Sequence, residues 1–262
     1  MNKIKTIILK EWAEVFKQRL VLFTVIFIPL LFTGMALGII LATGDTVVDA
    51  ASMQDFPGDV AATICAGVAE KDCFSVYLAT QFMFMFMMIP VIIPVTIAAY
   101  SIVGEKTTRS LEPLLATPIT TGELLAGKAL AAILPAVAAT WLGFIIFLVG
   151  MFIKDGTSLF TSLTQPLWLV AILAVGPLLA LLSVASALMV SSRVSDPRVA
   201  EQLSAVVVVP LVLLAFGQMA GLIILDRNMV LLIAGILLIL DAAAIYVAVR
   251  IFQRETILTK WK

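Results

Sequence analysis

The sequence predicts an all-α membrane protein that crosses the bilayer six times, and three observations support this class. Apolar residues make up 62% of the 262 residues and charged residues only 13%, whereas soluble domains average about 45–50% and about 25%. The mean hydropathy is +1.13. The apolar residues also gather in six stretches, each long enough for the helix of roughly 20 residues that crosses a hydrocarbon core.

The first element precedes these stretches and is amphipathic. Within residues 1–19, the apolar residues recur at spacings of three and four, which places them on one helical face: Ile4, Ile7, Ile8, Trp12, Val15 and Phe16. Such a helix lies in the plane of the membrane interface, with Trp12 at the depth of the headgroups. We therefore expect an elbow helix, followed by a single transmembrane domain over residues 20–262.

The six spans follow in order. They are expected at Leu20–Ala42, Phe74–Val103, Leu124–Phe152, Pro166–Val190, Leu203–Leu225 and Met229–Val249. The second and third are longer than a minimal span, so we expect them to tilt, kink or extend beyond the bilayer. Gly34 and Gly38, like Gly217 and Gly221, have the spacing that lets two helices approach closely. The close approach is either within one chain or between two copies.

Positive charge predicts the orientation of the spans. Of the 17 lysines and arginines, only Lys71, Lys154 and Arg227 fall in one set of loops, and all the others lie in the two termini and the alternate loops. Because cytoplasmic loops carry the excess of Lys and Arg, both termini are predicted to be cytoplasmic. We expect a multi-pass protein of the cell membrane, either a plasma or an inner membrane.

The outer loop 43–73 is long and acidic, and we interpret its carboxylates as groups that keep the loop solvated. It contains the only two cysteines, Cys65 and Cys73. An exported loop faces an oxidising compartment, in which disulfides persist. We expect a structural disulfide between Cys65 and Cys73, with two free thiols as the alternative.

The cytoplasmic segment 104–123 carries most of the functional information. Leu111, Leu114 and Leu115 fit one face of a short helix, and Pro118 ends that helix because it disfavours helical backbone at the preceding residue. Thr120 and Glu123 have the spacing of a capping box, which predicts that the next helix begins there. An apolar face with a charged rim suits docking into the groove of a partner.

These residues carry a resemblance to a family. Glu105-Lys106, Ser110-Leu111-Glu112, Leu114–Ile119, Glu123 and Gly127-Lys128 resemble the exporter-type (type-2) permease subunits of ATP-binding-cassette transporters. The resemblance covers the whole chain and implies a coupling helix at Ser110–Ile119 that inserts into an ATPase subunit. It also implies a second permease copy, identical or related. The residues expected to couple to the ATPase are Glu105, Arg109, Glu112, Leu114, Leu115 and Pro118.

The composition excludes several other functions. The chain has no histidine and a formal net charge of +0, so we expect no histidine-based catalysis, no metal site and no nucleic-acid partner. The sequence has no G-x-x-x-x-G-K-[ST] phosphate loop, so ATP and magnesium are expected on a partner ATPase. This chain itself is expected to bind no cofactor and to be no enzyme.

Asp241 is the clearest charge within a span, where a carboxylate costs about 2.5–3.5 kcal/mol on insertion scales. It either handles protons or cations, or forms a hydrogen bond between helices. Two other functions stay open beside the ATP-driven permease. One is an ion-coupled secondary transporter, for which Asp241 alone is thin support. The other is a membrane assembly factor that transports nothing.

Overall fold

The computed structural model describes residues 3–43, 70–107, 119–155, 157–220, 222–223 and 225–252. Every regular element in this part of the chain is a helix, and six stretches are long and apolar enough to cross a membrane. The all-α class and the six spans are thus confirmed. They comprise α2 (Arg19–Thr43), α4 (Glu70–Thr107), α6 (Thr121–Asp155), α8 with η2 and α9 (Pro166–Ser191), α10 with η3 and α11 (Pro197–Met219) and α12 (Arg227–Ile251).

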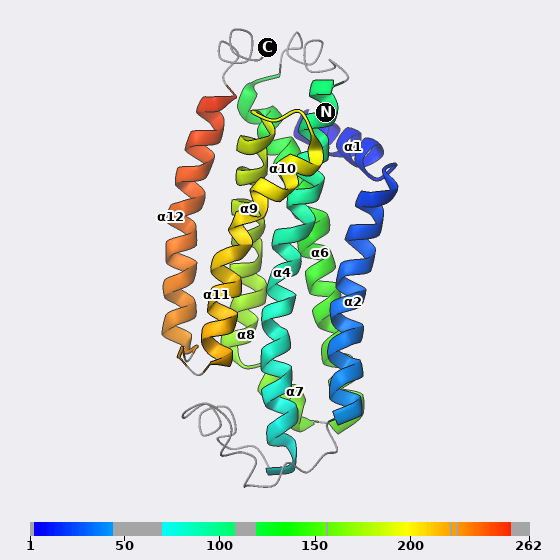
Figure 1. Cartoon of the computed structure of the whole chain (residues 1–262), viewed down its shortest axis with the longest axis vertical. Helices are drawn as coiled ribbons and strands as arrows, with labels where there is room; N and C mark the ends of the chain where they lie inside the picture. Colours follow the sequence, from blue (N-terminus) through cyan, green and yellow to red (C-terminus); the bar gives the residue numbers. More distant parts are fainter. Residues whose placement is uncertain are drawn as a thin grey trace.

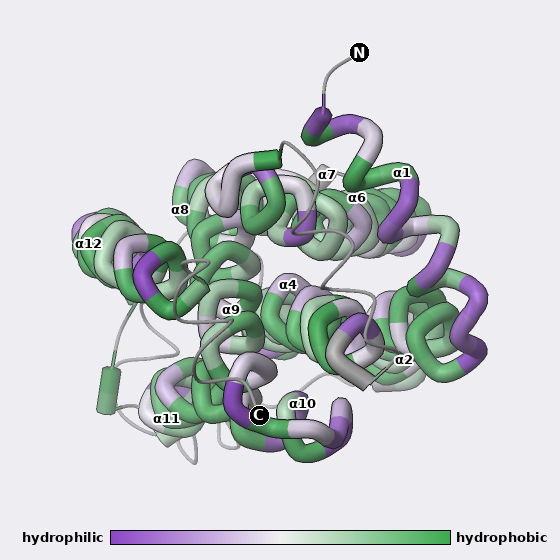
Figure 2. The backbone as a smooth tube through the Cα atoms, turned by 90° about the horizontal axis from the view of Figure 1, so that it is seen from above, coloured by the Kyte–Doolittle hydropathy of each residue, from purple (hydrophilic) through white to green (hydrophobic). Residues whose placement is uncertain are grey.

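The helices surround a central pair, as the view along the bundle shows (Figure 2). α4 and α9 (Gly176–Ser191) lie in the middle, and the other helices are arranged around them. α4 is the most enclosed span, with 83% of its most apolar stretch buried. Its Phe86 is fully buried and packs against Phe147 of α6, with the ring centroids 5.3 Å apart. The long second stretch of the sequence is therefore the core of the bundle.

The outward faces of the peripheral helices are apolar as well. Ile239 of α12 is 73% exposed, and Leu213 and Phe216 of α11 (Val208–Met219) are 65% and 64% exposed. Apolar surface of this extent is typical of contact with a membrane or with a partner protein. The surface therefore has the character that a multi-pass membrane protein requires.

The fifth span differs in position from its prediction, because it begins at Pro197 rather than at Leu203. Its first helix, α10 (Pro197–Ser204), starts at the N-cap residue Asp196, whose side chain accepts a hydrogen bond from the Arg198 backbone N–H at 2.8 Å. Figure 1 shows α10 inclined to α11, to which the short 3₁₀ helix η3 (Ala205–Val207) joins it. A search for apolar stretches alone misses α10, because half of this helix is polar.

The fourth span contains a turn of π-helix, η2 (Ala171–Val175), directly before Pro177. Proline has no N–H, so the Ile172 carbonyl five residues earlier cannot receive a π-type hydrogen bond from it. The indole N–H of Trp141 in α6 donates to this Ile172 carbonyl at 3.3 Å. This contact fixes the irregular turn against the neighbouring helix.

The two glycine pairs have different surroundings. A Cβ atom added at Gly34 or Gly38 of α2 would meet nothing within 4 Å, whereas one at Gly217 would lie 2.7 Å from Ile223 Cδ1. Gly221 lies outside the described residues. The described part of the chain therefore contains no close neighbour for the first pair.

Candidate coupling site at the ends of α4 and α6

Helix α1 (Lys3–Val15) lies across one end of the bundle (Figure 1). The predicted apolar face is buried or half-buried, and it packs against the beginning of α6. The indole N–H of Trp12 donates to the Ala131 carbonyl at 2.8 Å. A Cβ at Gly127 would lie only 2.6 Å from Ile7 Cγ2. Thus α1 approaches α6 closely at Gly127, where the missing side chain leaves room for Ile7.

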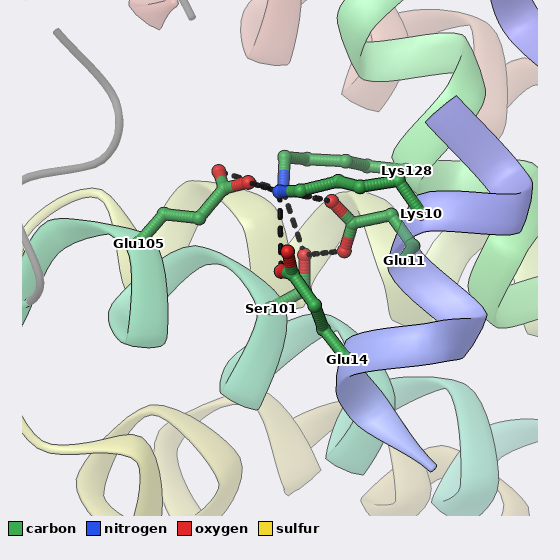
Figure 3. A network of polar contacts seen from close by, with 6 residues as sticks. All are labelled: Lys10, Glu11, Glu14, Ser101, Glu105 and Lys128. Carbon is green, nitrogen blue, oxygen red and sulfur yellow. Dashed lines mark hydrogen bonds and ion pairs between the residues drawn. The ribbon is translucent and has the colours of Figure 1, made fainter. Parts of the chain in front are cut away.

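Six polar side chains meet where α1, α4 and α6 come together (Figure 3). We call them the charge cluster: Lys10, Glu11 and Glu14 of α1, Ser101 and Glu105 of α4, and Lys128 of α6. Three of them are almost fully buried, since Glu11, Glu105 and Lys128 are 2%, 5% and 3% exposed. A buried charge is tolerated only when it is paired and hydrogen-bonded, so the contacts within this cluster decide whether the three helix ends stay together.

Lys128 lies at the centre of the charge cluster. Its Nζ is 2.7 Å from Glu11 Oε1 and 2.8 Å from Glu105 Oε2. It also donates to Ser101 Oγ at 2.8 Å, and the Ser101 hydroxyl donates to Glu11 Oε2 at 2.5 Å. An ammonium group has three donors, and here three oxygens surround it. Lys128 therefore joins α1 and α4 to α6.

Lys10 forms the outer half of the charge cluster. Its ammonium pairs with Glu105, with Glu14 at 3.2 Å and with Glu11 at 3.5 Å. Partial burial alone would lower the pKa of Lys10, but the hydrogen bond and the charge of Glu105 outweigh it and raise the pKa above its ordinary value. Lys10 therefore stays cationic and shares Glu105 with Lys128.

The pKa of the Glu11 carboxylate is also set by burial on one side and by charges and hydrogen bonds on the other. Burial by itself would raise its pKa, but the Lys128 cation and the hydrogen bonds from Lys128 and Ser101 prevail, so that the pKa of Glu11 is lowered. An open cavity adjoins this carboxylate between α1 and the end of α4, lined among others by Glu14, Gln18 and Tyr100. The outer side of the charge cluster thus faces water, while Lys128 is enclosed.

The charge cluster brackets the segment that the sequence predicts to be the coupling helix. Glu105 lies just before this segment, near the end of α4. On the other side, α6 begins with the predicted capping box: the Thr120 N–H donates to Glu123 Oε2 at 2.8 Å and the Glu123 N–H donates to Thr120 Oγ1 at 3.2 Å. Lys3 of α1 also pairs with Glu123 at 3.4 Å. Helix α1 therefore contacts the chain on both sides of residues 108–118.

The structure places only some of the predicted site residues. Glu105 lies in the charge cluster, with its carboxylate directed at lysines rather than at the surface. The other five residues expected to couple to an ATPase lie outside the described residues: Arg109, Glu112, Leu114, Leu115 and Pro118. Cys73 is disulfide-bonded, and Cys65 lies outside the described residues. Asp241 is buried in α12, 3% exposed, and no group of three metal-ligating side chains occurs in the described part of the chain.

Sequence reasoning missed Glu11 and the role of Lys128. Glu11 occupies the apolar face of α1, between Ile7 and Val15 on successive turns. A charge on the buried face of an amphipathic helix signals a partner of opposite charge elsewhere in the fold. That signal was present in the sequence, but the identity of the partner depends on which distant segment packs against α1.

The six apolar helices, the crosswise helix α1 and the charge cluster at its contact with the bundle define a multi-pass α-helical membrane protein. Its family follows from comparison with known proteins. The family model described as ABC-2 family transporter protein matches residues 5–256. The chain belongs to this family, so it is a membrane permease subunit of an ABC transporter. No curated protein matches the chain.

Proposed function

We propose that this chain is the permease subunit of an ATP-driven exporter and that a separate ATPase subunit hydrolyses the ATP. Membership of the ABC-2 family supports the permease role. The absence of a phosphate loop from the sequence supports a separate ATPase, which would bind ATP and magnesium. A second permease copy completes the membrane part. The distribution of lysines and arginines supports a cell-membrane location with both termini in the cytoplasm.

The charge cluster is the observation that carries this proposal. It connects α1, the end of α4 and the beginning of α6 on both sides of residues 108–118, through Lys128, Glu11 and Glu105. An ATPase that displaces this segment would therefore move three helix ends together rather than bend one loop. Since α4 is the central helix of the bundle, the displacement would reach the middle of the membrane domain and open a path outward.

The residues of the coupling segment have two roles in this proposal. Arg109, Glu112, Leu114, Leu115 and Pro118 supply the surface that the ATPase binds. Glu105 acts differently, because its carboxylate is 5% exposed and paired with two lysines. It positions the start of the segment relative to α1 and α6 and does not contact the partner.

A tagged purification in mild detergent from the native host tests the proposal, with mass spectrometry of the proteins that co-elute. We expect a stoichiometric protein with a phosphate loop to accompany the wild-type chain. The double variant Arg109→Glu with Leu115→Asp should lose it and elute later than the wild-type complex, still as a single symmetric peak. Arg227→Glu is the matched control, because it reverses an exposed charge at the opposite end of the bundle (Figure 1).

Two results would overturn the proposal or a part of it. A wild-type chain that is folded and elutes alone would contradict the separate ATPase. An ATPase that still accompanies the double variant would show that the partner binds elsewhere, and would remove the coupling role from residues 104–123.

A further inference from the structure

Asp241 has surroundings unlike those of the other acidic residues described in the structure. It lies near the middle of the 25-residue helix α12, is 3% exposed, and neither of its carboxyl oxygens has a hydrogen-bond partner among the described residues. By contrast, the buried Glu11 is paired with lysines. The coupling role proposed above makes no use of Asp241.

Asp241 lies on the buried face of α12, and we call the contact of this helix with its main neighbour α9 the α9–α12 seam. The buried residues of α12 form one stripe at helical spacing: Val230, Leu237, Asp241, Ala244 and Ala248. The main neighbour of α12 is α9, followed by η2 and α8 (Pro166–Val170). Asp241 therefore lies on the face of α12 that packs against the bundle and not on the face that turns outward.

Among the described residues, the main neighbours of α12 place no opposite charge within the seam. The segment Pro166–Ser191, which comprises α8, η2 and α9, contains no Asp, Glu, Lys or Arg. α6 makes a smaller contact with α12, and its charged residues Glu123, Lys128, Lys154 and Asp155 stand at its two ends. The arginines of α12 itself, Arg227 and Arg250, also lie at the helix ends.

Two serine hydroxyl groups of α9 donate to backbone carbonyls of their own helix rather than to Asp241. Ser183 donates to the Ala180 carbonyl at 2.8 Å and Ser186 to the Leu182 carbonyl at 2.9 Å, and a hydroxyl has one proton to donate. Ser191 is the last residue of α9. An ionised carboxylate in the seam would thus lack both a cation and a donor among the described residues, and such a charge is costly at membrane depth.

We propose that Asp241 is a proton-binding site and that the α9–α12 seam closes around its neutral carboxyl group. The neutral form loses the charge and gains an O–H that donates to a backbone carbonyl, the acceptor that helices offer most often. Loss of the proton creates a charge that only water can solvate. Deprotonation therefore separates α12 from α9, and closure of the seam takes a proton up.

Infrared spectroscopy of the full chain in lipid nanodiscs tests the protonation directly. At neutral pH, we expect a carbonyl stretching band of a protonated carboxyl group that shifts in heavy water and with isotope-labelled aspartate. The band should be absent from Asp241→Asn and unchanged in Asp226→Asn, the control that alters an exposed aspartate at the start of the same helix. The labelling assigns the band to aspartate even if a variant fails to fold.

Hydrogen exchange of α9 and α12 peptides tests the opening of the seam. Raising the pH by one unit above the midpoint increases the ratio of ionised to protonated Asp241 about tenfold. Exchange in α12 should therefore accelerate by up to about tenfold per pH unit in the wild type, relative to Asp241→Asn at the same pH. Because both chains are compared at equal pH, the intrinsic effect of pH on exchange cancels.

Two outcomes would overturn the proposal. One is a wild-type spectrum without a protonated aspartate band at neutral pH. The other is an exchange profile whose pH dependence is the same in the wild type and in Asp241→Asn. Neither result bears on the ATPase partner, so the failure of this inference is distinguishable from failure of the proposed function.

Discussion

At the residue scale, Lys128 is the side chain on which the contact of α1, α4 and α6 depends. Its 3% exposure means that water cannot replace it. Glu11 and Glu105 approach it from different helices. Both carboxylates are buried, so each needs a cation to compensate for the lost hydration. Lys10 compensates only in part, because it lies on the outer side of the cluster and also pairs with Glu14.

Lys128→Met should destabilise the chain by about 3–5 kcal/mol, the usual consequence of removing one partner of a buried ion pair. Thermal unfolding in detergent measures the loss. Lys154→Met at the other end of α6 is the control, since that lysine is half-buried and donates to the Ile40 carbonyl at 3.0 Å. Adding Glu11→Gln to Lys128→Met should recover part of the loss. Equal effects of the two lysine variants would contradict a special role for Lys128.

Protonation of Glu11 should weaken the charge cluster at acidic pH. Its pKa is lowered in the folded chain, so its stabilising contribution is fully present above the ordinary glutamate value of 4.5. The contribution is lost as the pH falls below that value and through the pKa of the folded state. The unfolding midpoint of the wild type should therefore fall on acidification in this range, and the dependence should be weaker in Glu11→Gln. Parallel pH profiles for the two chains would contradict this.

At the scale of elements, the packing of α1 on α6 depends on the absence of a side chain at Gly127. Its hypothetical Cβ would lie 2.6 Å from Ile7 Cγ2 and 2.8 Å from Ile7 Cβ, which is closer than atoms can pack. Since Trp12 and the charge cluster fix α1 further along, the helix cannot simply slide away from the added methyl group.

Gly127→Ala should accordingly cost about 1–3 kcal/mol of stability, as overpacking does elsewhere, and hydrogen exchange should show faster opening of α1. Gly122→Ala is the matched control on the same helix, because a Cβ at Gly122 meets nothing within 4 Å. Shortening the opposing side chain with Ile7→Ala should rescue Gly127→Ala. If both glycine variants behave alike, α1 does not depend on this close approach.

The elements were predictable from the sequence to different degrees. Hydropathy identified six spans because each is longer and more apolar than a soluble helix, and the capping box of Thr120 and Glu123 identified the start of α6. The start of the fifth span was misplaced, since the half-polar helix α10 does not register as apolar. The partners of Glu11 were not predictable, because residues 90 and 117 positions apart meet only through packing.

At the scale of the whole molecule, the glycine pair of α2 lies on the outside of the bundle. Gly34 and Gly38 are exposed, and a Cβ at either position would meet nothing within 4 Å. Small residues four positions apart allow two helix backbones to approach closely in a membrane. We therefore propose the first glycine pair as a contact with the second permease copy of the proposed transporter.

The variant Gly34→Leu with Gly38→Leu should reduce dimerisation by at least about tenfold in dissociation constant, if the pair lies at that interface, because each added side chain holds the backbones apart. Light scattering in detergent or photobleaching steps in nanodiscs measure the oligomeric state. Gly235→Leu adds the same bulk to an exposed position of α12 and serves as the control. An unchanged dimer in the glycine-pair variant would place the interface on another helix.

The charge cluster also has a consequence for biosynthesis. Glu11 and Lys128 are separated by 117 residues, and Trp12 and Ala131 by 119. The buried face of α1 therefore stays without its α6 partners until α2, α4 and the start of α6 have left the ribosome. Helix α1 is thus synthesised before α4 and α6 but can dock only after both have formed. Docking of α1 therefore requires that α4 and α6 already stand side by side as they do in the folded bundle.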